Sequence, residues 1–130
     1  MRRGFGMLVA LAGVATLVGC GEAKVTQCNK ITEVINKVDV KVDLTSEEAF
    51  NKLADNLEKN SKDLDAVTVA DPKLVDLKKR YADILRTSAK GYRDAAAAAK
   101  EGKAPDMNAA TKPFEDSGKV VDELNKYCQE

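Results

Sequence analysis

The side chains with the most chemistry open to them in this 130-residue sequence are its three cysteines, at positions 20, 28 and 128. A thiol can be acylated, form a disulfide, bind a metal or act as a nucleophile. Nucleophilic catalysis by cysteine or serine usually needs a neighbouring general base, and the sequence contains no histidine. A Ser–Lys pair stays open as an alternative for the four serines, which are Ser46, Ser61, Ser88 and Ser117. We predict that the protein is not an enzyme.

The sequence also gives little reason to expect a metal or a cofactor. A haem or zinc site in a helical protein would typically use histidine or free cysteine. The paired carboxylates, such as Asp39 with Asp43 and Glu115 beside Asp116, match no calcium-binding loop with its central glycine and terminal glutamate. We interpret these pairs as solvated polar faces, and we predict no metal site and no cofactor.

Residues 1–20 have the layout of a secretory leader. Arg2 and Arg3 precede a short, uncharged apolar stretch, which Leu17-Val18-Gly19-Cys20 closes. This layout is typical of a signal peptide, whereas a membrane-spanning helix needs about 20 predominantly apolar residues. The four closing residues resemble the lipobox of bacterial lipoproteins. The resemblance implies cleavage after residue 19, a diacylglycerol thioether on the sulfur of Cys20 and acylation of its amine.

The same resemblance indicates where the mature chain would be found. In enteric-type lipoproteins a residue other than aspartate after the lipidated cysteine, here Gly21, implies the outer membrane, with the protein facing the periplasm. Removing residues 1–19 leaves 111 of the 130 residues, with 19 basic and 21 acidic side chains. This near-neutral balance gives no electrostatic reason to expect a nucleic-acid partner. The lipid on Cys20 would therefore be the membrane anchor.

The domain boundaries follow from this leader and from the first helical pattern. Residues 20–27 are predicted to be a lipidated tether and residues 28–130 a helical domain. From about Thr26 to Val38 the apolar residues are mostly three or four positions apart, which is the spacing of one helix face. They are Cys28, Ile31, Val34, Ile35 and Val38. The alternation over residues 38–42 resembles a strand, but it has no partner in the sequence, so we predict an extended connection.

A second helix is predicted from a capping box at residues 45–48 to about Asp65. In this box Thr45 accepts a hydrogen bond from the amide of Glu48. The face expected to be buried consists of Phe50, Leu53, Leu57 and Leu64.

The third helix is predicted to be the longest. Asp71 is placed to cap it and Pro72 to occupy its first position, where a missing amide costs nothing. Glu101-Gly102 ends it, because glycine accepts the left-handed conformation found at helix ends. Its heptad-like seam consists of Leu74, Leu77, Tyr81, Ile84, Ser88, Tyr92, Ala95 and Ala99.

A fourth helical region is predicted to begin near Asp106 or Asn108. Pro113 either kinks this helix or starts its main part, and the pattern alone leaves both alternatives open. One face of it is expected to contain Phe114, Gly118, Val121, Leu124 and Cys128.

Four helices with short connections predict an all-α, up-and-down four-helix bundle. In this topology the first helix starts at the end of the bundle where the fourth helix stops, so Cys28 and Cys128 would meet. An exported protein permits disulfides, and we predict one between these two residues, although two unrelated buried thiols are the alternative. Closing so long a loop typically stabilises a domain by about 2–4 kcal/mol.

The predicted function is a non-enzymatic interaction or structural module that binds another envelope protein through a helical face. Pilotins, small helical lipoproteins that escort outer-membrane secretins, are a fold-level analogy without a shared motif. The candidate surface is Ala95, Ala96, Ala97, Ala98 and Ala99, which lack long side chains, although helix propensity alone also explains this run. We expect Tyr81 and Tyr92 to pack in the core and Tyr127 to be available as an interface anchor.

An alternative function is that of a carrier or sensor that holds a small apolar ligand between the helices. A continuous apolar cavity would favour the carrier, and a solid core would favour the interaction module. With the anchor on Cys20, the end carrying Cys28, Tyr127 and Cys128 would lie near the membrane. The connections around residues 38–44 and 101–108 would then point into the aqueous space.

Overall fold

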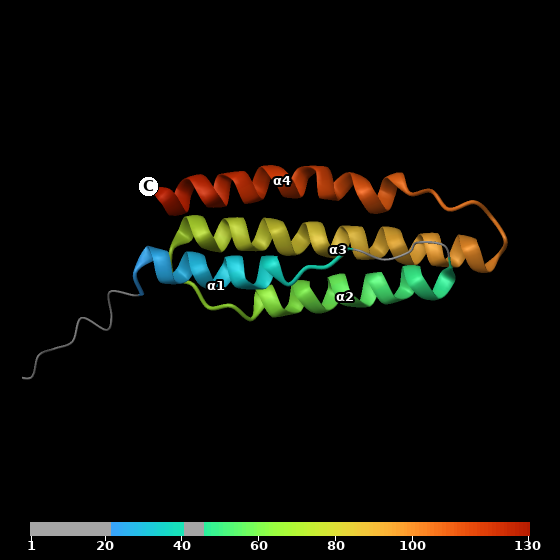
Figure 1. The fold of residues 1–130 in the computed structure, drawn as a ribbon, viewed down its shortest axis with the longest axis horizontal. Coiled ribbons are helices and arrows are strands. Elements are labelled where there is room, and N and C mark those ends of the chain that lie inside the picture. Colours follow the sequence, from blue (N-terminus) through green and yellow to red (C-terminus); the bar gives the residue numbers. More distant parts are fainter. Residues whose placement is uncertain (1–21, 41–45) are drawn as a thin grey trace, which may run out of the picture.

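The computed structural model describes residues 22–40 and 46–130. These residues form α1 (Lys24–Asn36), α2 (Glu47–Asp65), α3 (Pro72–Lys100) and α4 (Asn108–Gln129), with no strand among them. Successive helices run in opposite directions (Figure 1). The predicted up-and-down four-helix bundle, with its third helix longest, is therefore confirmed. The lipobox with Cys20, and residues 41–45 with Thr45, lie outside the described residues.

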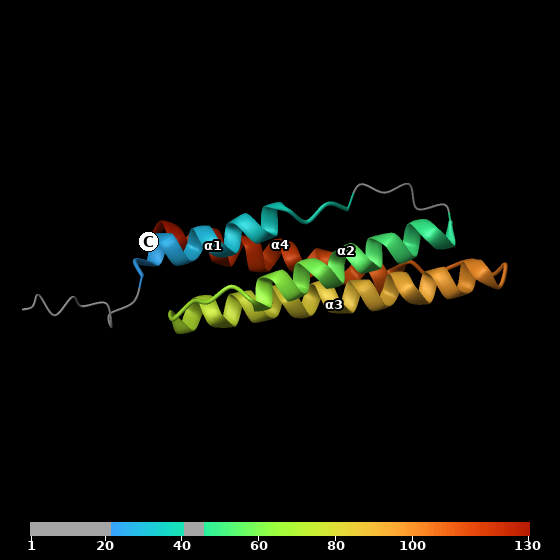
Figure 2. The same cartoon turned by 90° about the horizontal axis from the view of Figure 1, so that it is seen from below.

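The central helix of the bundle is α3, which packs along α2 on one side and along α4 on the other. The shortest helix, α1, contacts all three others. At about 1.5 Å per residue, its 13 residues cover less than half of the 29-residue α3. Figures 1 and 2 show α1 beside α4, in the half of the bundle that contains the C-terminus.

The disulfide holds this end together. The sulfur atoms of Cys28 and Cys128 are 2.05 Å apart and their Cα atoms 6.1 Å apart, across a sequence separation of 100 residues. The prediction of this bond is confirmed. It joins the first turns of α1 to the last turn of α4, at the end of the bundle opposite the connection between α3 and α4 (Figure 1).

The start of α2 differs by one residue from the sequence prediction. Ser46, and not Thr45, is the N-cap, and its hydroxyl accepts a hydrogen bond from the amide of Ala49 at 3.2 Å. Serine and threonine are both good N-caps. The pattern alone therefore could not decide which of two adjacent hydroxyls would cap the helix.

Both ends of α3 agree with the prediction. An Oδ1 atom of Asp71 accepts from the amides of Lys73 and Leu74, at 2.8 and 3.2 Å. At the other end Gly102 has φ +70°, and its amide donates to the Ala99 carbonyl. The amide of Lys103 donates to Ala98, which completes a Schellman motif.

The folded unit begins earlier than predicted, because α1 starts at Lys24 and Gln27 is buried. The side chain of Gln27 accepts hydrogen bonds from the amides of Ala70 and Asp71, at 2.8 and 3.0 Å, and donates to the Glu22 carbonyl. Residues 24–27, which the sequence analysis placed in the tether, thus belong to α1. These amides precede α3, and a polar side chain that satisfies them is part of the fold rather than of a linker.

The core is a single hydrophobic cluster along the bundle. All four residues predicted to be buried in α2 are buried, as are Tyr81 and Tyr92 of α3. In α4 the prediction was partly wrong, because Gly118 is exposed and Val120 is buried. The face of α4 that packs against α3 is thus rotated about the helix axis relative to the predicted face. At the edge of this face lie three partly buried residues, Val121, Phe114 and Cys128.

Pro113 lies inside α4, which runs continuously from Asn108, so it does not start the helix. Because Pro113 has no amide hydrogen, the carbonyl of Ala109 cannot receive its usual intrahelical hydrogen bond. The backbones of α3 and α4 come close together near this point, at Gly91 and Ala110. A Cβ atom added to Gly91 would lie 2.5 Å from the Cα atom of Ala110 and 2.6 Å from the Ala109 oxygen. Only glycine permits this approach of the two helices.

Candidate interaction surfaces

The alanine run is not the flat surface that the sequence suggested. Ala95 and Ala96 are buried, with exposed fractions of 1% and 2%, while Ala98 and Ala99 are partly buried and Ala97 is exposed. A run of five consecutive residues in a helix covers all sides of it. Because α3 is the central helix, part of this run must face the core, and Ala97 alone provides no docking face.

Tyr127 at the disulfide end is already bound within the chain. Its hydroxyl donates to Oδ2 of Asp71 at 2.7 Å, which raises the pKa of Tyr127 and lowers the pKa of Asp71. The ammonium group of Lys24 lies 4.6 Å from the centre of the tyrosine ring and donates to the Tyr127 carbonyl at 2.9 Å. Tyr127 therefore ties α4 to α1 and to the cap of α3, and it is not a free anchor for a partner.

A bidentate ion pair joins α3 to α4. The two terminal nitrogens of Arg80 donate to the two carboxylate oxygens of Glu123, at 2.8 and 3.0 Å. These hydrogen bonds lower the pKa of Glu123 to about 2. Two parallel bonds fix the relative position of the helices better than a single contact does.

The acid stability of the bundle should depend in part on this pair. A depressed carboxyl pKa contributes stability that is fully present above the ordinary value of 4.5 and is lost as the pH falls toward about 2. We expect the difference in free energy of unfolding between the wild type and Glu123→Gln to shrink over this range. Urea denaturation at a series of pH values would measure it.

Glu115→Gln is the matched control, because Glu115 is an exposed α4 carboxylate for which the described part of the chain shows no ion pair. Because no ion pair is removed, its difference from the wild type should not follow the pH dependence expected for Glu123→Gln. An equal pH dependence for both variants would contradict the assignment to the Arg80 pair.

Two more arginines of α3 clamp α2. Arg93 donates to Glu58 at 2.8 Å and to Asp55 at 2.7 Å. Arg86 donates to Asp65 and to the hydroxyl of Ser61, both at 2.7 Å. These clamps border a groove of about 520 Å³ between α2 and α3. Both guanidinium groups that border this groove are thus engaged within the chain.

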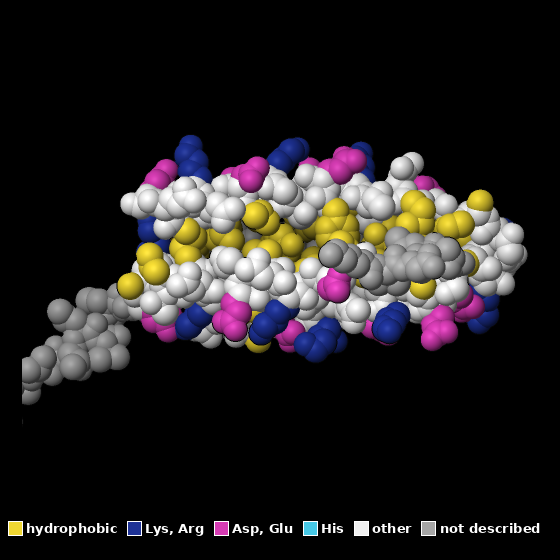
Figure 3. Space-filling view, in the orientation of Figure 1, with side chains coloured by type: hydrophobic (Ala, Val, Ile, Leu, Met, Phe, Trp, Pro, Cys, Tyr) yellow, Lys and Arg dark blue, Asp and Glu magenta, His cyan; other side chains and the backbone are white. Residues whose placement is uncertain are grey.

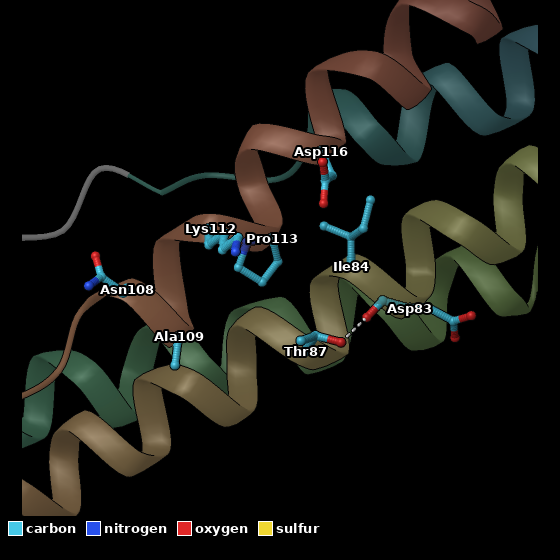
Figure 4. Close-up of a pocket in the computed structure, with 8 residues that line it drawn as sticks. All are labelled: Asp83, Ile84, Thr87, Asn108, Ala109, Lys112, Pro113 and Asp116. Carbon is cyan, nitrogen blue, oxygen red and sulfur yellow. Dashed lines mark hydrogen bonds between the residues drawn. The ribbon is translucent and has the colours of Figure 1, made fainter.

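A second groove, of about 420 Å³, lies between α3 and α4 on the surface around Pro113 (Figure 4). Most of the surface that lines it is apolar, contributed in part by Ile84 and Pro113, and charged residues border it. Figure 4 shows Asp116 pointing from α4 toward Ile84, while the carboxylate of Asp83 turns away from the groove. Thr87 donates its hydroxyl hydrogen to the Asp83 carbonyl at 2.9 Å. Asp116 accepts a hydrogen bond from the ammonium group of Lys119 at 3.2 Å, and Lys112 also lines this groove. An apolar side chain of a partner fits against Ile84.

No serine of the described chain hydrogen-bonds to a lysine. Ser46 caps α2, Ser61 donates to the Ala82 carbonyl at 3.2 Å and Ser117 donates to the Phe114 carbonyl. Ser88 is fully buried, and its hydroxyl finds no partner among the described residues. Such a group is a local cost to stability rather than a prepared nucleophile.

The contacts that sequence reasoning missed all join residues distant in the chain. Gln27 reaches residues more than 40 positions away, as does Arg80, and the Pro113 groove combines one turn of α3 with two of α4. No local pattern marks such pairs. Figure 3 shows how polar and apolar side chains are distributed on one face of the molecule. Hydrophobic side chains lie along the seam below α4, and charged side chains lie on the outer faces of the helices.

None of the described helices combines the length and the apolar character needed to cross a bilayer. No protein-family model, no curated protein and no solved structure matches this chain.

Proposed function

We propose that this protein is a lipid-anchored, non-enzymatic interaction module of a bacterial cell envelope. The observation that supports it best is the Cys28–Cys128 bond, because stable disulfides are typical of exported proteins and rare in the cytosol. It agrees with the leader and the Leu17–Cys20 lipobox, which imply export and acylation at Cys20. The outer membrane, with the bundle in the periplasm, is the proposed location.

The arrangement of the interior favours an interaction module over a carrier of apolar ligands. The side chains of α2, α3 and α4 fill a continuous core in which alanine, serine and glycine bring the helices close together. The grooves around Pro113 and between Arg86 and Arg93 are open surface features bordered by charged residues. A carrier would need an enclosed apolar space for its ligand.

The Pro113 groove is the proposed docking site, in place of the alanine run. It belongs to the part of the bundle away from the disulfide, which an anchor at Cys20 would direct away from the membrane. We propose an envelope protein that inserts an apolar side chain against Ile84 and places a lysine or arginine beside Asp116. This basic group shares the carboxylate with Lys119, whose ammonium group donates to Oδ1 of Asp116 at 3.2 Å.

Lipidation is tested at Cys20. Mass spectrometry of the protein extracted from membranes of its native cells should show a mature N-terminus at Cys20 with a diacylglyceryl group, and Cys20→Ala should accumulate as an unprocessed precursor. An unmodified Cys20 in the wild-type protein would refute the anchor.

Docking is tested in the same cells with a photo-crosslinking amino acid at Thr87, or at Asn56 as a control. Both positions are exposed, and Asn56 lies on α2, outside the Pro113 groove. One discrete crosslinked protein is expected from Thr87 only, and Asp116→Lys should reduce its yield several-fold by repelling the basic group. Equal crosslinking from both positions, or no effect of Asp116→Lys, would count against this site.

A further inference from the structure

We propose that α1 is a detachable strap, which the Cys28–Cys128 bond holds on an otherwise self-sufficient body formed by α2, α3 and α4. Reduction of this bond releases α1, and the three-helix body stays folded. The structure thus contains a redox-sensitive conformational device, and this inference does not depend on the proposed lipid anchor.

The first argument is how little of the core α1 supplies. Of the 19 buried hydrophobic residues in the described chain, only Cys28 and Ile31 belong to α1. Val34 and Ile35 in its second half are only partly buried. Removing α1 therefore takes away a small part of the apolar burial that stabilises the fold.

The second argument is that α1 is a weak helix by itself. It has 13 residues, and its N-cap, Ala23, makes no side-chain hydrogen bond. It has no acidic residue in its first turn and no basic residue in its last turn. Isolated helices of this length are marginal in water, so α1 depends on docking for its helical state.

The third argument is that the polar attachments of α1 cluster around the disulfide. Gln27 binds the amides of Ala70 and Asp71, and Lys24 binds the Tyr127 carbonyl. Both residues lie within about one turn of Cys28. Once the covalent bond is open, this end of α1 is held by these three hydrogen bonds and by the packing of Ile31.

The body, in contrast, has its own connections. Three arginines of α3 form interhelical ion pairs, Arg80 to α4 and Arg86 and Arg93 to α2. The other 17 buried hydrophobic residues belong to α2, α3 and α4. No interaction among these three helices passes through the disulfide.

The chemical step needs a dithiol reductant. One of its thiolates attacks the sulfur of Cys128, since Cys128 is partly exposed whereas Cys28 is 4% exposed. The S–S bond breaks, Cys28 leaves as a thiolate that takes up a proton, and a mixed disulfide forms on Cys128. The second thiolate of the reductant displaces Cys128, which is protonated in turn. Two electrons and two protons thus yield two protein thiols and an oxidised reductant.

Hydrogen exchange followed by mass spectrometry tests the strap in the full mature chain, with and without dithiothreitol. The double variant Cys28→Ser/Cys128→Ser, without reductant, is the second form of the experiment. We expect amides of α1 to lose roughly 100-fold in protection in both forms, while peptides from the interiors of α2, α3 and α4 change by less than about 3-fold.

Three results would overturn the proposal. The first is unchanged protection of α1. The second is a loss of similar size in α1 and in the body, which would make the bundle one cooperative unit. The third is a loss confined to the last turns of α4, which would make the C-terminus, and not α1, the part that the bond holds in place.

Discussion

Gly91→Ala should lower the free energy of unfolding by about 2–3 kcal/mol, although alanine is the better helix former. The added Cβ atom would lie 2.5 Å from the Cα atom of Ala110 and 2.6 Å from the Ala109 carbonyl oxygen. These are backbone atoms, which cannot rotate away as the end of a flexible side chain could. The helices α3 and α4 must therefore separate locally, and the packing around Ala110 is lost.

Gly118→Ala provides the matched control for this effect. Gly118 is an exposed glycine inside α4, and a Cβ atom there would have nothing within 4 Å. This substitution should raise the free energy of unfolding by about 0.5–1 kcal/mol through helix propensity alone. Chemical denaturation of both variants would measure the two effects, and a stabilised Gly91→Ala would show that the helices are farther apart than described here.

Tyr92→Ala should destabilise the protein by about 3–5 kcal/mol, the range for removing a large aromatic side chain from a core. Tyr92 is 4% exposed, and its ring centre lies 6.4 Å from that of Phe50. This pair joins α3 to the first turns of α2, in the part of the bundle that α1 does not reach.

Tyr92→Phe separates the ring from its hydroxyl. The described structure shows no hydrogen bond of this hydroxyl, and burial raises its pKa. We expect a change of less than about 1 kcal/mol in thermal or denaturant unfolding. A loss as large as that of Tyr92→Ala would mean that the hydroxyl, and not the packed ring, stabilises this part of the bundle.

The disulfide is a long-range contact that local sequence patterns were sufficient to predict. Its pairing followed from two local observations, the helical periodicity and the positions of Cys28 and Cys128 near the ends of the folded segment. Short connections force neighbouring helices to be antiparallel, and an even number of antiparallel helices returns the chain to the end where it started. The Cα atoms are accordingly 6.1 Å apart.

The candidate site could not be predicted in this way. The alanine run was predicted to be an interaction surface because its residues lack long side chains, yet Ala95 and Ala96 are buried. To predict the Pro113 groove, one must know which residues of α3 lie beside which residues of α4. Helix periodicity specifies which residues share a face, but it does not specify how two helices are shifted along each other.

The sequence alone therefore determined the four helices, the caps at Asp71 and Gly102, the antiparallel order and the disulfide, since each depends on interactions within a few residues or on the order of the helices. Only the tertiary structure decided the rotation of α4 that buries Val120 and exposes Gly118, the contact at Gly91 and the ion pairs of Arg80 and Arg93. These features are set by the close packing of side chains from two or three helices at once. A stripe of apolar residues can meet a neighbouring helix in several rotations, and the choice among them depends on how all the facing side chains fit together.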